Sequence, residues 1–209
     1  RALRLNWDVG THLHPDERYL TMVVSTVRFP GEEASGQGGG RDVDVCRGPI
    51  PCLKLYWSTG RSPLNPANYD EFATYVYGTL PLFATRAVGR WVDTACATQS
   101  AVLPTLYRAL ILGESGPCTV GHYTGYGGIH LVGRSLSTLA DLLTLLGLVL
   151  LVKALADRGT ALIAGLLYAF AVLPVQHAHF FVVDSFATVF VVWTLAVATY
   201  AMLKDRQVW

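Results

Sequence analysis

The sequence predicts an all-α protein: a multi-pass transmembrane helical bundle with amphipathic interfacial helices in a long outer loop. First, the 209 residues are 52% hydrophobic and 15% charged, whereas an average soluble domain has about 25% charged residues. Second, most charges and all four cysteines fall within residues 1–125, and residues 126–203 are nearly continuous apolar sequence. Third, this apolar part divides into segments long enough to cross a bilayer. The net charge of +1 argues against nucleic acid as a partner.

Two regions and three spans follow from this pattern. We assign residues 1–125 to an extracytoplasmic first loop with interfacial helices and residues 126–209 to a transmembrane region. Because a membrane-crossing helix needs about 20 mostly apolar residues, we expect spans at 129–152, 161–179 and 185–203. Three buried helices of a soluble core are the alternative, but the very short connectors would leave too little polar surface to solvate them.

Basic residues predict the orientation of the spans, because Lys and Arg in short loops favour the cytoplasmic side. They lie in the first connector and after the last span: Lys153, Arg158, Lys204 and Arg206. The link QHAHFFVVD, residues 176–184, then faces outside, as does everything before residue 126. The polar segment THLHPDERYL, residues 11–20, therefore lies on the same side as this link, and we expect the two to meet.

The outer loop contains segments of different character. Residues 32–42 are Gly-rich and charged, which is typical of a mobile loop. Residues 65–91 carry apolar and aromatic side chains, with Pro81 expected to interrupt any single long helix, and residues 104–112, PTLYRALIL, are similar. Both segments favour amphipathic helices at the membrane interface. A small helical cap that only packs on the spans is the alternative.

All four cysteines fall in the outer loop: Cys46, Cys52, Cys96 and Cys118. An oxidising compartment would allow disulfides there. Cys46 and Cys52 bracket the short sequence RGPIP and are the favoured pair, although four cysteines allow three connectivities. Free thiols are the alternative.

Two charged residues lie within the first span, where a charge costs at least about 2.5–3.5 kcal/mol and usually faces a cavity or a partner. Arg134 and Asp141 are two helical turns apart, so both can face the interior of the bundle. Arg134 lies near the outer end, where a guanidinium could bind a phosphate bidentately; snorkelling to the headgroups is its alternative role. Asp141 lies deeper and could pair with another helix.

Two polar clusters are candidates for chemistry. The first could bind a metal, accept a proton from a substrate, or lie solvated on a turn: His12, His14, Asp16 and Glu17. The second lies at an outer helix end and consists of His177, His179 and Asp184. Its histidines lack the spacing of an HExxH zinc site, and Asp184 could simply cap the third span. The sequence has no G-x-S-x-G elbow, Walker loop or dinucleotide fingerprint.

Several short motifs occur in a characteristic order: the acid pair in HPDERY, the amphipathic stretch YVYGTLPLFATRAVGRW, a span that opens GRSLSTLADLLTLL, and VQHAHFFVVDSFAT between two spans. Over nearly its whole length the chain resembles the N-terminal part of a C-type (GT-C) membrane glycosyltransferase of the dolichyl-phosphate-mannose protein mannosyltransferase-like group, family 39. It lacks the family's span before the acid pair and the later spans, so we expect a fragment.

The resemblance implies an integral-membrane hexosyltransferase, mannosyltransferase-like and linked to protein glycosylation. Such an enzyme moves a sugar from a polyprenyl- or dolichyl-phosphate donor to a protein, lipid or glycan acceptor on the outer face of the cell membrane, typically with inversion of the anomeric carbon. Asp16 matches the family's usual catalytic acid, and Glu17 stands beside it. An inverting transfer needs one carboxylate to deprotonate the acceptor hydroxyl, and a phosphate leaving group needs positive charge more than a general acid.

The expected substrate-binding residues are His14, Arg18, Arg134, His177, His179 and Asp184. A divalent cation, Mg or Mn, could bridge the donor phosphate, with Asp16, Glu17, His14 or Asp184 as ligands; the family is mixed on metal dependence. Two other classes remain open: a multi-pass transporter, and a membrane scaffold without catalysis. The former would use charged residues of the spans to line a path.

Overall fold

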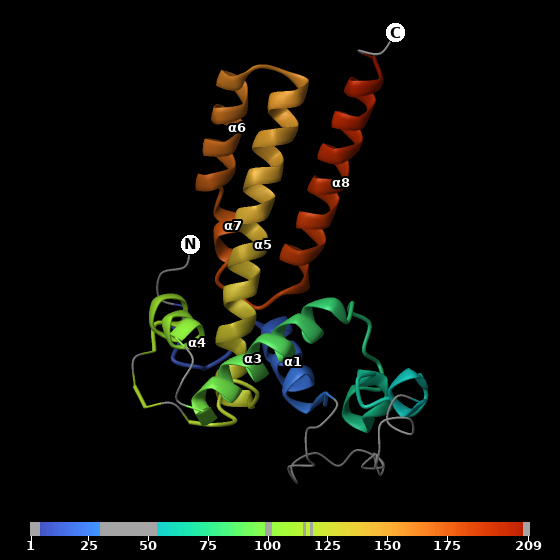
Figure 1. The fold of residues 1–209 in the computed structure, drawn as a ribbon, viewed down its shortest axis with the longest axis vertical. Coiled ribbons are helices and arrows are strands. Elements are labelled where there is room, and N and C mark those ends of the chain that lie inside the picture. Colours follow the sequence, from blue (N-terminus) through green and yellow to red (C-terminus); the bar gives the residue numbers. More distant parts are fainter. Residues whose placement is uncertain (1–4, 30–53, 99–101, 115, 118, 207–209) are drawn as a thin grey trace.

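The computed structural model describes residues 5–29, 54–98, 102–114, 116–117 and 119–206. Over these residues the chain is helical and contains no strand, which confirms the predicted all-α class. Figure 1 shows α5, α6 and α8 as one elongated arm, with α1, α3 and α4 gathered around the first turns of α5. The helices are α1 (Pro15–Thr26), α3 (Leu80–Thr98), α4 (Val102–Leu106), α5 (Tyr126–Leu155), α6 (Arg158–Phe170), α7 (Val172–His177) and α8 (Val183–Arg206), with the short turns η1 (Pro66–Asn68), η2 (Asp70–Phe72) and the π-helical η3 (Tyr107–Leu112).

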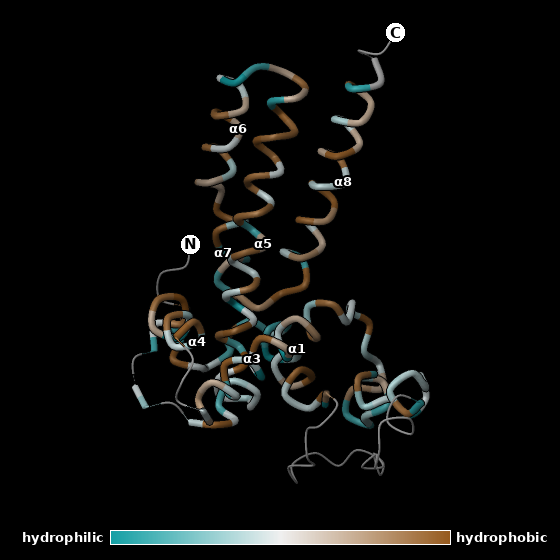
Figure 2. The backbone as a smooth tube through the Cα atoms, in the orientation of Figure 1, coloured by the Kyte–Doolittle hydropathy of each residue, from teal (hydrophilic) through white to brown (hydrophobic). Residues whose placement is uncertain are grey.

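Two helices in the described part of the chain, α5 and α8, are long and apolar enough to cross a membrane. The predicted spans 129–152 and 185–203 lie inside them. Large apolar side chains remain exposed along the arm, among them Leu139, Leu166 and Val197. In Figure 2 the arm is mostly apolar, and the turn between α5 and α6 is hydrophilic. An apolar surface of this kind suits a lipid environment better than water.

The expected second span, 161–179, is not one continuous helix. α6 ends at Phe170, Ala171 has an extended backbone with φ −64° and ψ 132°, and α7 then covers only Val172–His177. Pro174 accounts for the break, because its ring would clash with the carbonyl of Phe170 in a continuous helix and it has no N–H to donate to that carbonyl. A continuous helix over residues 161–179 is therefore not formed, and the span itself remains a prediction.

The arm is held together by hydrogen bonds between its helices. α5 packs against both α6 and α8. The hydroxyl of Tyr168 in α6 donates to Asp141 at 2.9 Å, and the indole N–H of Trp193 in α8 donates to the carbonyl of Leu143 at 3.0 Å. Asp141 therefore pairs with a neighbouring helix, as its position in the first span suggested. A carboxylate placed among apolar helices requires such a partner.

The outer region packs on α5 through two apolar cores. One joins α1, α3 and the segment before α8 through buried side chains such as Leu20, Leu82 and Phe181. The other joins α3, η3 and α5 through Val92, Leu112 and Leu131 among others. As predicted, no single helix runs from residue 65 through Pro81: α3 begins at Leu80. Pro81 is its second residue, where its missing N–H costs nothing.

The remaining expectations for the outer loop concern the cysteines and the Gly-rich segment. Cys96, near the end of α3, is disulfide-bonded, so the alternative of four free thiols is wrong. Cys46, Cys52 and Cys118 lie outside the described residues, and so does the segment 32–42. The favoured Cys46–Cys52 pair and the mobile loop remain predictions.

Candidate functional site

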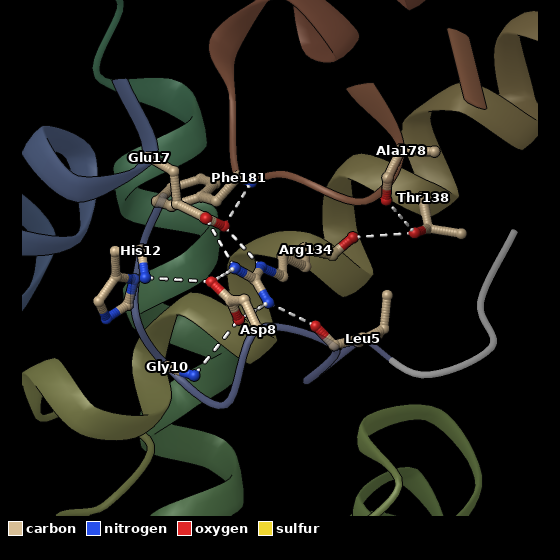
Figure 3. Close-up of polar contacts among 9 residues, drawn as sticks. All are labelled: Leu5, Asp8, Gly10, His12, Glu17, Arg134, Thr138, Ala178 and Phe181. Carbon is tan, nitrogen blue, oxygen red and sulfur yellow. Dashed lines mark hydrogen bonds and ion pairs between the residues drawn. The ribbon is translucent and has the colours of Figure 1, made fainter. Parts of the chain in front are cut away.

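A fully buried arginine from α5 holds two acids near the start of the described outer region (Figure 3). The guanidinium of Arg134 donates to both carboxylate oxygens of Asp8 at 2.8 Å each. It donates to both oxygens of Glu17 through Nε at 2.6 Å and Nη2 at 2.7 Å. Such paired, charge-assisted contacts are the strongest hydrogen bonds that an arginine makes. One cation in α5 thus holds two acids from the segment before α1 and from α1 itself.

The fifth N–H of Arg134 is also used. Nη1 donates to the backbone carbonyl of Leu5, and the ring of Trp7 lies against the guanidinium at 5.7 Å from its centroid. A guanidinium has five N–H groups, so protein acceptors occupy all of them. In this arrangement Arg134 has no donor left for a phosphate, which contradicts the phosphate-binding role expected from the sequence. Its position gives it a structural role instead.

A tight turn positions Asp8 for this contact. Its carboxylate accepts from the backbone N–H groups of Gly10 at 3.3 Å and His12 at 3.0 Å. The turn requires left-handed backbone angles at Val9 (φ 52°) and His12 (φ 48°), where non-glycine residues are uncommon. The hydrogen bonds from Arg134 lower the pKa of Asp8 well below its usual range, against the opposing effect of burial. The acid is therefore ionised over the whole physiological pH range.

Glu17 connects α1 to the link before α8. Besides Arg134, its Oε1 accepts from the backbone N–H of Phe181 at 2.9 Å. The ring of Phe181 packs so close to Gly133 that a Cβ there would lie 2.3 Å from it. The hydroxyl of Thr138 donates to the carbonyl of Ala178 at 2.7 Å in the same region. The predicted meeting of residues 11–20 with the link 176–184 is therefore confirmed.

Asp16, the neighbour of Glu17, has a different environment. Successive residues of an α-helix point about 100° apart, so Asp16 leaves the buried ion pairs and is only half-buried. Its Oδ1 accepts from the hydroxyl of Tyr77 at 3.3 Å. Burial raises the pKa of Tyr77, and the charges of Asp16 and Asp184 raise it further. Asp184, the exposed acid at the start of α8, therefore lies close enough to Tyr77 for its charge to act on the phenol.

Aromatic rings line this side of Asp16. Tyr77 packs near Tyr75 and Tyr19, with ring centroids 5.9 and 6.1 Å away. Tyr19 in turn stacks on Tyr75 at 6.2 Å. The half-buried carboxylate of Asp16 thus lies at the edge of a cluster of three tyrosine rings.

Two buried histidines lie on the other side of the Arg134 contacts. The rings of His12 and His130 meet edge to face at 4.4 Å, and both side chains are nearly inaccessible. Nδ1 of His12 and both ring nitrogens of His130 have no hydrogen-bond partner among the described residues. Burial lowers the pKa of His12, so a second positive charge next to Arg134 is disfavoured.

The other predicted site residues lie around the junction of α1 and the link. Arg18 is exposed and donates one bond to the carbonyl of His12 at 3.3 Å. His14 precedes α1, with its ring 4.9 Å from Phe180, and its Nδ1 has no hydrogen-bond partner in the part of the chain that the structure describes. His179 is bonded through Nδ1 to the carbonyl of Val175 at 2.8 Å, and His177 is half-buried at the end of α7.

No group of three or more His, Cys, Asp or Glu side chains within the described ranges is arranged to hold a metal ion. Sequence reasoning missed three participants: Asp8, Tyr77 and His130. A signal for Asp8 did exist, because a charged residue placed in an apolar span requires a counter-charge. Tyr77 gave no comparable signal.

Comparisons with protein-family models, with curated proteins and with solved structures find no match to this chain.

Proposed function

We propose that this protein is an integral-membrane glycosyltransferase of the GT-C type. It moves a sugar from a polyprenyl- or dolichyl-phosphate donor to an acceptor hydroxyl on the outer membrane face, and Asp16 is the base. The proposal rests on the order of sequence motifs and on the geometry around Asp16. The structure supports Asp16 as the base rather than Glu17 or Asp8. Arg134 binds the carboxylates of Glu17 and Asp8, whereas Asp16 accepts from Tyr77 instead.

The observation that carries the proposal is that the adjacent acids Asp16 and Glu17 have different environments. Glu17 is fully buried and committed to Arg134 and Phe181, so it fixes α1 against α5 and the link. Asp16 is thereby held at a defined place with a half-buried carboxylate, which accepts one hydrogen bond, from Tyr77, among the described residues. A base needs such a placement within hydrogen-bond reach of the group that it deprotonates.

The reaction is a single displacement. The carboxylate of Asp16 takes the proton of the acceptor hydroxyl while the acceptor oxygen bonds to the anomeric carbon. The bond from that carbon to the donor phosphate breaks, and the lipid phosphate leaves with the electron pair. Positive charge near the leaving phosphate lowers the barrier. Because Arg134 is fully used, we assign this role to the remaining basic side chains at the start of α1, His14 and Arg18. Arg18 is exposed, and its guanidinium donates to the carbonyl of His12.

The test is sugar transfer by the purified protein in lipid nanodiscs from a panel of polyprenyl-phosphate sugars. We expect Asp16→Asn to reduce transfer by about 100-fold or more, because positioned general bases contribute about 10²–10⁴-fold. Glu71→Gln is the matched control, since Glu71 is an exposed acid on η2, and it should transfer as the unsubstituted protein does. Equal transfer by the Asp16 variant would refute the role of Asp16, and absence of transfer from every donor would refute the function.

A further inference from the structure

α5 is longer than a membrane is thick. Its 30 residues extend about 45 Å at 1.5 Å per residue, whereas the hydrocarbon core measures about 30 Å. About ten residues of α5 therefore lie outside the core. Burial identifies them, because residues 128–135 are buried beneath the outer region and the first large exposed side chain after them is Leu139. The basic residue of the helix, Lys153, lies at the opposite end.

These lengths place the outer boundary of the hydrocarbon core near Leu136–Leu139. A stretch of 20 residues that ends at Leu155 begins at Leu136, in agreement with the change in burial. The Arg134 ion pairs then lie just outside the core, where charged groups cost less than at its centre.

The helix formed by α4 and η3 is attached to α5 at this level. The hydroxyl of Tyr107 shares a hydrogen bond with that of Ser135, and Tyr107 also lies 5.9 Å from Trp91 of α3. Figure 1 shows α4 beside the first turns of α5, away from α8. The outward face of this helix is thus within reach of the bilayer surface.

The polarity of this helix is inverted relative to a helix that faces water. Its one charged residue, Arg108, is 9% exposed and donates to the hydroxyl of Tyr123 and the carbonyl of Gly116, both at 2.9 Å. The large apolar side chains point outward instead, with exposures from 38 to 73%: Val102, Leu103, Leu106, Leu110 and Ile111. A helix in water exposes its charges and buries its apolar face; one that lies in a membrane interface buries an apolar face in lipid.

We propose that the outward face of α4–η3, defined by Val102, Leu103, Leu106, Leu110 and Ile111, binds the lipid bilayer in its interfacial region. The partner is the lipid itself, at the depth where α5 leaves the hydrocarbon core. This surface anchors the outer region beside α5 and fixes the height of α1 above the membrane. The inference rests on α5 crossing a membrane and is independent of the proposed sugar chemistry.

The test uses nitroxide labels on cysteines introduced one at a time into the protein in nanodiscs, with the unsubstituted protein carried through the same labelling. Leu110→Cys probes the proposed surface. Val120→Cys is the control, because Val120 is a similarly exposed apolar residue in the loop that precedes the first residue of α5, Tyr126. Leu139→Cys serves as the reference inside the core. Collisions of each label with oxygen, which enters lipid, and with a water-soluble nickel chelate are measured by electron paramagnetic resonance.

We expect the oxygen-to-nickel collision ratio at Leu110 to be several-fold higher than at Val120 and lower than at Leu139. A ratio at Leu110 equal to that at Val120 would place the helix in water and overturn the proposal. Protection of the Leu110 label from both reagents would also overturn it, because protein rather than lipid would then cover this face. Sugar transfer does not enter any of these measurements, so their failure is distinct from failure of the proposed function.

Discussion

The substitution Arg134→Met tests how the outer region is attached to α5. Methionine keeps much of the volume of the side chain and removes its charge. Two carboxylates, those of Asp8 and Glu17, would then face each other in a site where neither is exposed on its side chain. The five hydrogen bonds of the guanidinium disappear with the cation. The acids can relieve the repulsion only by taking up protons or by separating.

The expected loss of stability is large. Removal of one partner from a buried ion pair costs about 3–5 kcal/mol, because it leaves an uncompensated buried charge. For a protein of this size, each kcal/mol lowers the melting temperature by about 2–4 °C, which gives a decrease of about 6–20 °C. Combining Arg134→Met with Asp8→Asn and Glu17→Gln should recover part of the loss, because it removes the two uncompensated buried charges.

The assay is thermal unfolding of the protein in nanodiscs, followed by tryptophan fluorescence. Trp7 lies against the guanidinium and reports directly on the attachment. The matched control is Arg158→Met, at an exposed arginine that is the first residue of α6, which should change stability by at most about 0.5 kcal/mol. A decrease for Arg134→Met no larger than that of the control would refute the account of Arg134 as the buried anchor.

Two further outcomes follow from the same geometry. Gly133→Ala should cost about 1–3 kcal/mol by overpacking, because its Cβ would lie 2.3 Å from the ring of Phe181. Gly127→Ala is the control: its Cβ meets nothing within 4 Å, so the substitution should be neutral or slightly stabilising. Equal melting temperatures for the two variants would contradict the packing of Phe181 on Gly133. Because Arg134 lowers the pKa of Asp8 in the folded state, the stabilisation is fully present above the unfolded value of about 3.9 and is lost as the pH falls through the lower folded value. Stability measured from pH 7 to 2 should therefore decline below about pH 4, and less steeply in Asp8→Asn; parallel curves would exclude this linkage.

Hydropathy and charge predicted the class of the fold and its two longest apolar helices well. They also predicted that residues 11–20 would meet the link before α8, because loop charges constrain which segments share a side of the membrane. The break at Ala171 was not predicted, since mean hydropathy is insensitive to one proline, Pro174, that removes a donor and clashes with the preceding turn.

The candidate site was predicted only in part, for a geometric reason. Asp16 and Glu17 are adjacent in sequence, and the sequence alone gives no means to decide which one faces the protein interior. That choice depends on how α1 packs against α5. The packing is fixed by the buried contact between Glu17 and Arg134, which are 117 residues apart in the sequence. Asp8 was missed because its side chain is positioned by a turn with left-handed backbone angles at Val9 and His12. Neither valine nor histidine predicts such a turn from the sequence.

The central claim is that Asp16 acts as the base in a single displacement at a polyprenyl-phosphate sugar. Its most direct test is the anomeric configuration of the product, determined by nuclear magnetic resonance after transfer from a donor of known configuration. One displacement inverts the anomeric carbon, so a β-linked donor should give an α-linked product, and Asp16→Asn should give almost none. Retention of the donor configuration would require a second displacement and would contradict the role assigned to Asp16.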